Sequence, residues 1–432
     1  ILIGLVGSEM CIRDRIPADQ AYSVTAIKLS DTYSEYTTAN KQTLEITDLG
    51  TGGIIPKSAY KVQWDEKAHS FEATFARDWV AANWKAGSNP RVLLRFEAKV
   101  NEDAPTDKTV GNKAALTVNN GVTPSNKVEN EPPVIKPSKQ DTQKDPTINI
   151  DGKTALLGDK VYYRVNIDAS RLTDTAYKVW RLGMVDDYDQ EYLTLDAKHV
   201  EILDETGRDR TGEFNIQDKD GVLYAFARTV DTQIPATGET VPGDPQPGDL
   251  KAYSEKTDKD YDPLKDPSID QSLLGHTYQV VMPMTVTKVK DGHTVENTAT
   301  QVTNDRRDKT NTVTNPLKEI NPKKDVSVQV GGDSIDGKSV YLNHTFLYQL
   351  DSSTLPADRA YQKIANWGIT DRLDPAYDKA TGQWAVYAAR DLYRGGEAIA
   401  RKGERIAGSG FDSSRLGGDM FAANIDPSTG LV

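Results

Sequence analysis

The stretch Lys160-Val-Tyr-Tyr-Arg-Val-Asn-Ile-Asp168 alternates apolar and polar side chains and is rich in β-branched and aromatic residues. Residues 91–100, 277–286 and 339–351 follow the same period of two, and we expect each of these stretches to form a β-strand. Pro283 predicts an edge strand or a bulge, because proline lacks the N–H that a sheet ladder needs. Many short strands joined by polar turns indicate an all-β fold of immunoglobulin-like Greek-key sandwiches.

Short helices or turns are expected in three loops, at residues 75–84, 169–180 and 353–367. The loop at 238–249 and the acidic stretch at 254–266 offer carboxylates that could hold calcium. Their spacing does not match an EF-hand loop, so a solvated charged loop is the favoured interpretation. No other metal site and no cofactor is expected.

Two phrases recur along the chain and define its register. An Ala-Tyr pair precedes an aspartate by nine or ten residues at three places, which gives Asp31, Asp186 and Asp371. Two asparagines separated by 14 residues occur twice, as Asn112 with Asn126 and as Asn297 with Asn311. The chain is therefore interpreted as a tandem array of related domains.

The 432 residues carry a net charge of -12 and a single cysteine, Cys11. The acidic balance argues against nucleic-acid binding and favours a soluble, extended array. Residues 1–15 are too short for a membrane span and have no basic segment before the apolar run, which argues against a signal peptide. The stretch 6–15 looks like translated sequencing-adapter sequence, so we interpret residues 1–15 as a non-native, adapter-derived segment. Without Cys11 the chain has no thiol, and a covalent staple would need other chemistry.

Proline-rich polar linkers at 130–138 and 315–322 set the domain boundaries. We expect a partial domain at 16–133 that lacks its first strands, and a complete domain at 134–317. A third domain at 318–432 stops before its pattern is finished. The array is expected to be elongated and monomeric.

A lysine near the start of a domain, an aspartate inside it and an asparagine near its end suggest a self-made amide cross-link. Burial can deprotonate a lysine and keep a carboxylic acid neutral, so that the amine attacks the asparagine amide and ammonia leaves. In the complete domain we assign Lys144, Asp186 and Asn297 to these roles, with Asp186 as the proton relay. Lys144 is preferred because Lys-Asp followed by Ile-Asp-Gly-Lys recurs in the third domain.

Several alternatives stay open. Lys139 rivals Lys144, because Asn112 precedes Lys139 by 27 residues and Asn297 precedes Lys324 by the same number. The rival acids are Asp187 and Asp189, and the rival amides are Asn304, Asn311 and Asn315. Incomplete equivalents of the triad are expected at Asp31 and Asn112 in the first domain and at Lys324 and Asp371 in the third.

An enzymatic reading is the alternative function. A glycosidase could use paired carboxylates, such as Asp186 with Asp187 or Asp371 with Asp374. Neighbouring residues of a strand point to opposite faces, which makes the first pair a poor one. We expect no intermolecular catalysis, only the single-turnover cross-link.

The same phrases carry a family resemblance. Ile150-Asp-Gly-Lys153, Val185-Asp-Asp-Tyr188 and Glu296-Asn-Thr-Ala-Thr-Gln301 resemble the C-terminal region of streptococcal antigen I/II family adhesins. That resemblance implies a surface protein anchored to the cell wall of a Gram-positive bacterium, with immunoglobulin-like domains that form Lys–Asn isopeptide bonds. It implies adhesion to a host glycoprotein or a microbial surface ligand. No membrane insertion is expected in this segment.

Overall fold

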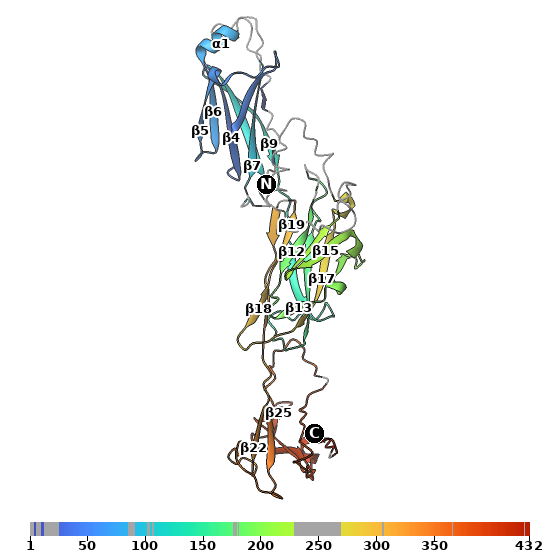
Figure 1. The fold of residues 1–432 in the computed structure, drawn as a ribbon. Coiled ribbons are helices and arrows are strands. Elements are labelled where there is room, and N and C mark those ends of the chain that lie inside the picture. The colour runs from blue at the N-terminus through green and yellow to red at the C-terminus, as the bar shows by residue number, and fades with distance from the viewer. Residues whose placement is uncertain are drawn as a thin grey trace. The chain divides into compact units, whose positions relative to one another are not determined.

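The structure is a computed structural model, and strands dominate it (Figure 1). It describes residues 4–5, 10–12, 26–84, 91–101, 104–105, 108–175, 179, 181–228, 269–304, 306–364, 366–426 and 428–432. The chain divides into two compact units, residues 1–319 with 358–361, and residues 320–357 with 362–432. The first unit holds two β-sandwiches, which confirms the all-β expectation.

The first sandwich packs two sheets around a core that includes Leu29, Ile46 and Phe71. One sheet has the order β5-β6-β3-β8-β9, and in the other β7 pairs with β4 as well as with β1 and β2. The strands are β1(Gly4–Leu5), β2(Met10–Ile12), β3(Ile27–Tyr33), β4(Thr37–Asp48), β5(Tyr60–Asp65), β6(Ser70–Phe75), β7(Val92–Val100), β8(Val110–Val118) and β9(Gly121–Asn130). The expected helix in 75–84 is confirmed as α1(Arg77–Asn83), which lies at one end of this sandwich (Figure 1).

The second sandwich has one sheet of order β10-β11-β17-β13, in which β14 also pairs β17, and a facing sheet of order β15-β16-β12-β19-β20. A short ribbon of β18 and β21 completes it. The strands are β10(Ser138–Thr142), β11(Lys160–Asp168), β12(Leu182–Asp187), β13(Leu193–Leu195), β14(Glu201–Asp204), β15(Phe214–Lys219), β16(Val222–Ala227), β17(Thr277–Val286), β18(Thr294–Asn297), β19(Ala299–Thr303), β20(Arg306–Lys309) and β21(Val313–Pro316). Its core draws apolar residues from every one of the longer strands.

The sequence predicted that Pro283 marks an edge strand or a bulge, but the structure places it in an interior strand. It lies in β17, which pairs with β11 on one side and with β13 and β14 on the other. The pairing with β14 ends at Val281 and the pairing with β13 begins at Met284. Proline is tolerated here because it falls where the partner strand changes: its carbonyl accepts from the Asp196 N–H at 2.9 Å, and neither β13 nor β14 pairs with it and calls for a donor at its nitrogen.

The third region contains three two-stranded sheets and a modest core that includes Ala400, Ile406 and Leu416. The strands are β22(Lys323–Ser327), β23(Leu347–Asp351), β24(Ala385–Tyr387), β25(Leu392–Arg394), β26(Glu397–Ala400) and β27(Arg405–Gly408). The expected strand at 339–351 is correct only for 347–351. In the loops 169–180 and 353–367 the described residues form turns and irregular structure rather than helix.

Gly183 tests how tightly the second sandwich is packed. A Cβ built there would lie 2.3 Å from the Ala225 carbonyl oxygen and 2.5 Å from a Phe226 ring carbon. We expect Gly183→Ala to lower the free energy of unfolding of this sandwich by about 1–3 kcal/mol, because backbone must move to make room. Gly212→Ala is the matched control, since nothing lies within 4 Å of its Cβ position. Urea unfolding of both variants measures the difference.

Candidate functional site

A buried ion pair joins the two sheets of the second sandwich. Lys139 lies on β10 in one sheet and Asp186 on β12 in the other, and the Lys139 ammonium donates to Asp186 Oδ2. Both side chains are fully buried, with no exposed surface. The alternation of β12 turns Leu182, Met184 and Asp186 to the same core face. Asp186 therefore occupies a core position of β12 that its alternation would otherwise give to an apolar side chain.

Burial dominates the electrostatics of Lys139. It lowers the pKa of the amine, because loss of water penalises the ammonium more than Asp186 and Asp141 stabilise it. The Tyr163 ring lies beneath the amine, with its centroid 4.9 Å from Nζ. A lysine held in this way is closer to its neutral, nucleophilic form than a surface lysine is.

The strand register places Asn297 near Asp186. Asp186 is opposite Ala299 in the β12–β19 register, and Asn297 precedes Ala299 by two residues and is 1% exposed. Neither the amide nitrogen nor the amide oxygen of Asn297 has a hydrogen-bond partner among the described residues. An unpartnered buried amide is costly and rare in folded proteins.

The other asparagines proposed from the sequence are engaged elsewhere. Asn311 clamps the backbone of Lys139 with two hydrogen bonds of 2.9 Å, one to its N–H and one to its carbonyl. Asn315 donates to the Ile150 carbonyl at 3.0 Å. Asn304 accepts from the backbone N–H of Arg181 at 3.3 Å. Asn311 thus positions the lysine strand.

The structure revises the choice of lysine. Lys144 lies exposed in the turn after β10, and its backbone carbonyl accepts from Arg164, while Lys139 takes the place beside Asp186. The rival acid Asp187 is exposed, and Asp189 pairs with His293 at 3.0 Å.

A signal in the sequence could have found the lysine. Lys139 precedes Asp186 by 47 residues, and Lys324 precedes Asp371 by the same number. Lys139 also precedes Ile150 by 11 residues, as Lys324 precedes Ile335. The Lys-Asp dipeptide at 144–145 matches Lys324-Asp325, but these distances favour Lys139.

Sequence reasoning missed a second buried acid. Asp141 follows Lys139 by two residues on β10, so both side chains face the core. Burial raises the pKa of Asp141 to about 7, although the Asn315 amide near its carboxyl group opposes the shift. In the third region Val326 on β22 takes the place of Asp141. The Ile335 N–H donates to the Val326 carbonyl, as the Ile150 N–H donates to the Asp141 carbonyl in the second sandwich.

The first sandwich repeats the acid and the amide. Asn112 on β8 donates to Asp31 Oδ1 on β3 at 2.7 Å. Asp31 is 2% exposed, and burial raises its pKa to about 7 although the Asn112 hydrogen bond opposes the shift. No lysine forms an ion pair with Asp31 among the described residues of this sandwich.

The third region repeats the lysine and the acid. Lys324 on β22 contacts Asp371 Oδ1 at 2.8 Å, and its Nζ lies 4.3 Å from the centroid of the Tyr348 ring on β23. Lys139, Asp186 and Tyr163 therefore correspond to these three residues. The lysine side chain here is 43% exposed.

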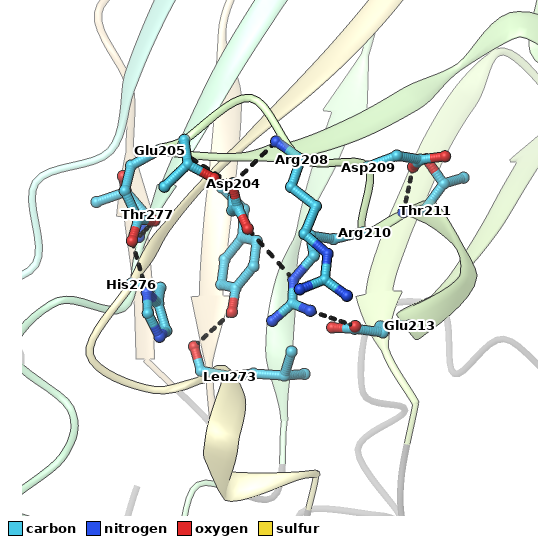
Figure 2. A network of polar contacts seen from close by, with 12 residues as sticks. Asp204, Glu205, Arg208, Asp209, Arg210, Thr211, Glu213, Leu273, His276 and Thr277 are labelled. Carbon is cyan, nitrogen blue, oxygen red and sulfur yellow. Dashed lines mark hydrogen bonds and ion pairs between the residues drawn. The ribbon is translucent and has the colours of Figure 1, made fainter.

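Another polar network lies at one end of β14 and β17 (Figure 2). Arg210 pairs with Glu213 at 2.7 Å, and Glu205 pairs with His276 at 2.6 Å. The buried Tyr278 donates its hydroxyl to the Leu273 carbonyl at 2.8 Å. These bonds connect a turn to the ends of two strands, which is a structural role.

The acidic loops at 238–249 and 254–266 lie outside the described residues. Within the described part of the chain, no group of three or more His, Cys, Asp or Glu residues could hold a metal ion. None of the described helices is long and apolar enough to cross a membrane.

Comparison with known families adds to this geometry. The sequence model described as "Cell surface antigen I/II C2 terminal domain" matches residues 13–132 and 137–317, and the one described as "Cell surface antigen C-terminus" matches residues 321–432. The chain belongs to the cell surface antigen I/II family. Its domains are those of a surface adhesin family, as the sequence predicted.

Individual relatives are more distant. The chain is 29% identical over 237 residues to the "Aggregation substance" of Enterococcus faecalis, an alignment that covers 54% of this chain and 15% of that protein. The antigen I/II segment thus spans about 15% of the length of this curated relative.

Two solved structures are also similar. The C-terminal domain of the Streptococcus agalactiae AgI/II polypeptide BspA gives a TM-score of 0.49 at 13% identity, covering 70% of this chain and 88% of that one. The C-terminal domain of the Streptococcus pyogenes antigen I/II-family protein AspA gives 0.49 at 13%, covering 70% and 87%.

The raised pKa of Asp31 predicts a pH dependence. The folded first sandwich holds a proton that the unfolded chain releases near pH 3.8, so stability present below that pH is lost as the pH rises through about 7. We expect the urea midpoint, followed by hydrogen exchange in β3 and β8, to fall between pH 4 and pH 7.5. Asp31→Asn should flatten this fall, whereas Asp78→Asn on the exposed face of α1 should leave it unchanged. A midpoint that is constant in the parent chain contradicts the assignment.

Proposed function

We propose that this antigen I/II segment is an adhesin module whose second sandwich closes an amide bond between Lys139 Nζ and Asn297 Cγ, with Asp186 as the proton relay. The observation that carries the proposal is the buried Lys139–Asp186 pair with the unpartnered Asn297 amide near it in the strand register. Burying three polar groups in a core costs free energy, and amide formation would remove one of them, the charged ammonium.

The reaction needs only these side chains. A proton first passes from the Lys139 ammonium to Asp186, which leaves a neutral amine and a neutral acid. The amine attacks Cγ of Asn297, and the acid hydrogen-bonds to the amide and stabilises the oxyanion. The bond from Cγ to Nδ2 then breaks, while the nitrogen of Lys139 gives up a proton and the leaving group gains one through Asp186. The products are an amide and ammonia.

Preorganisation supplies the rate. Asn311 fixes the backbone of Lys139, and Tyr163 and the surrounding core hold the amine in place. Reacting groups fixed in one orientation behave as if present at very high concentration. Because the bond forms once within the chain, the protein would perform a single turnover and no intermolecular catalysis.

The amide would stabilise the sandwich by tying its first strand to a late one. It closes a loop of about 160 residues, for which the disulfide chain-entropy model gives about 5 kcal/mol. This chemistry requires no thiol, in agreement with a chain whose one cysteine is Cys11.

The adhesive role extends to the complete protein. We propose that the segment belongs to a protein anchored to the wall of a Gram-positive bacterium, and that it supports or contributes binding to host glycoproteins or to other microbes. The family match supports a surface location. The cross-link would keep such a module folded outside the cell.

Intact-mass measurement tests the cross-link directly. We expect the mass of the chain to be lower than its sequence mass by about 17 Da, the mass of one ammonia released on amide formation. Lys139→Arg and Asn297→Ala should each restore the sequence mass, and Asp186→Ala should do so through loss of the relay. Lys144→Arg is the matched control and should keep the deficit. A full sequence mass in the parent chain would refute the proposal.

A further inference from the structure

Asp141 is a third ionisable group in the core around Lys139. It follows Lys139 by two residues on β10, and its side chain is fully buried on the same core face. Residues two apart on a strand lie about 7 Å from each other, so this acid and the lysine share one stretch of core. The proposed reaction of Lys139, Asp186 and Asn297 makes no use of Asp141.

Neutral polar groups line one side of the Asp141 carboxyl group. Tyr163 lies directly opposite Asp141 in the β10–β11 register, so their side chains share one face. The Tyr163 hydroxyl donates to Asn315 Oδ1 at 3.4 Å, and Asn315 Nδ2 donates to the Ile150 carbonyl at 3.0 Å. Burial, together with the Asp141 and Asp186 carboxylates, holds the pKa of Tyr163 well above its usual value, so this hydroxyl stays a neutral donor.

A single buried ammonium therefore faces two buried acids. Lys139 donates to Asp186, and Asp141 has no other buried cation near it among the groups that shift its pKa. Burial raises the pKa of Asp141 to about 7; the Asn315 amide and, more weakly, Lys139 oppose this rise, while Asp151 in the following turn adds to it. Asp141 thus changes its charge near neutral pH.

The charge of Asp141 affects how firmly Lys139 holds its proton. With Asp141 neutral, the ammonium faces one carboxylate, that of Asp186, and the cost of burial weighs against its charge. With Asp141 ionised, two carboxylates attract the same ammonium, and this attraction favours the protonated amine. Amide formation needs the neutral amine, so the two states of Asp141 differ in reactivity.

We propose that Asp141 is a positioning residue that controls closure of the amide through Lys139. In its neutral form it leaves Lys139 able to pass a proton to Asp186, and in its ionised form it holds that proton on Lys139. Its charge acts mainly on the lysine, because both lie on β10 whereas Asp186 lies on the facing sheet. The inference rests on the proposed Lys139–Asn297 bond and adds a pH-sensitive control to it. Transfer from Lys139 to Asp186 exchanges no proton with solvent, whereas Asp141 releases one when it ionises.

This control predicts an inverted pH profile. An amine that attacks a carbonyl group generally reacts faster as the pH rises, because more of it is neutral. Here closure should slow as the pH rises through about 7, because the reactive form requires neutral Asp141. Once Asp141 is largely ionised, the rate should fall by up to about tenfold per pH unit, in proportion to the neutral fraction that remains.

The rate of closure is measured on the full chain. Chain made by cell-free translation is collected in urea, which keeps it unfolded, and is then diluted into buffers between pH 6 and pH 8.5. Samples are quenched in acidic urea, and intact mass gives the fraction that lacks about 17 Da, the mass of one ammonia. We expect closure to be about tenfold slower, or more, at pH 8.5 than at pH 6.

Two variants separate the charge of Asp141 from its structural role. Asp141→Asn keeps the shape of the side chain but cannot ionise, so its closure rate should be the same at pH 6 and pH 8.5. Asp145→Asn removes an exposed carboxylate from the turn after β10 and is the matched control, which should keep the parent profile. A merely structural role of Asp141 would change the rate by the same factor at every pH.

The outcomes distinguish this role from the cross-link itself. Closure of the parent chain at one rate across this pH range, or faster at high pH, overturns the role of Asp141 while the Lys139–Asn297 bond stands. A slope that persists in the Asp141→Asn chain does the same. No mass deficit at any pH refutes the bond, and the role of Asp141 falls with it. The parent profile decides the question even where a variant folds poorly.

Discussion

The contact between Lys139 and Asp186 is the constraint on which the second sandwich depends. It spans the two sheets, and it places opposite charges in a core that is largely apolar. Removing one partner of such a pair costs about 3–5 kcal/mol, because the other charge is left buried and alone. The surrounding strands must therefore hold both residues in register. The hydrogen bonds of Asn311 to the lysine backbone show one way in which they do so.

The same arrangement is distributed unevenly along the chain. The second sandwich has lysine, acid and amide, the first has Asp31 with Asn112, and the third region has Lys324 with Asp371. The burial and charge of each remaining residue depend on which partners its domain contains. Asp31 is buried without a lysine and favours its neutral form, while Lys324 remains exposed and pairs as an ordinary surface ion pair. Three copies of one motif thus sample three different electrostatic states.

The sequence predicted the fold class correctly and singled out Asp186, which the structure places in the core, because both depend on local patterns. Alternation defined β11 and β17, and repetition of an Ala-Tyr phrase identified Asp186. The lysine was harder, since Lys139 lies on the core face of a short strand and Lys144 lies only five residues later, in the turn that follows that strand. A dipeptide match favoured the exposed one. Asp141 and the interior position of Pro283 depend on strand pairing across the sheet, and no local pattern reports that pairing.

The positions of β10 and β18 also decide how a pulling force would travel along the polypeptide. Tension entering through the linker before Ser138 reaches Lys139 almost at once. With an amide to Asn297 in place, the load would cross directly to the late strand, and the residues between them would carry none of it. The segment that includes β11 to β17 would therefore not be extended by the force. A surface protein built in this way would extend under shear by its linkers and its last strands, while most of the sandwich stayed unstretched.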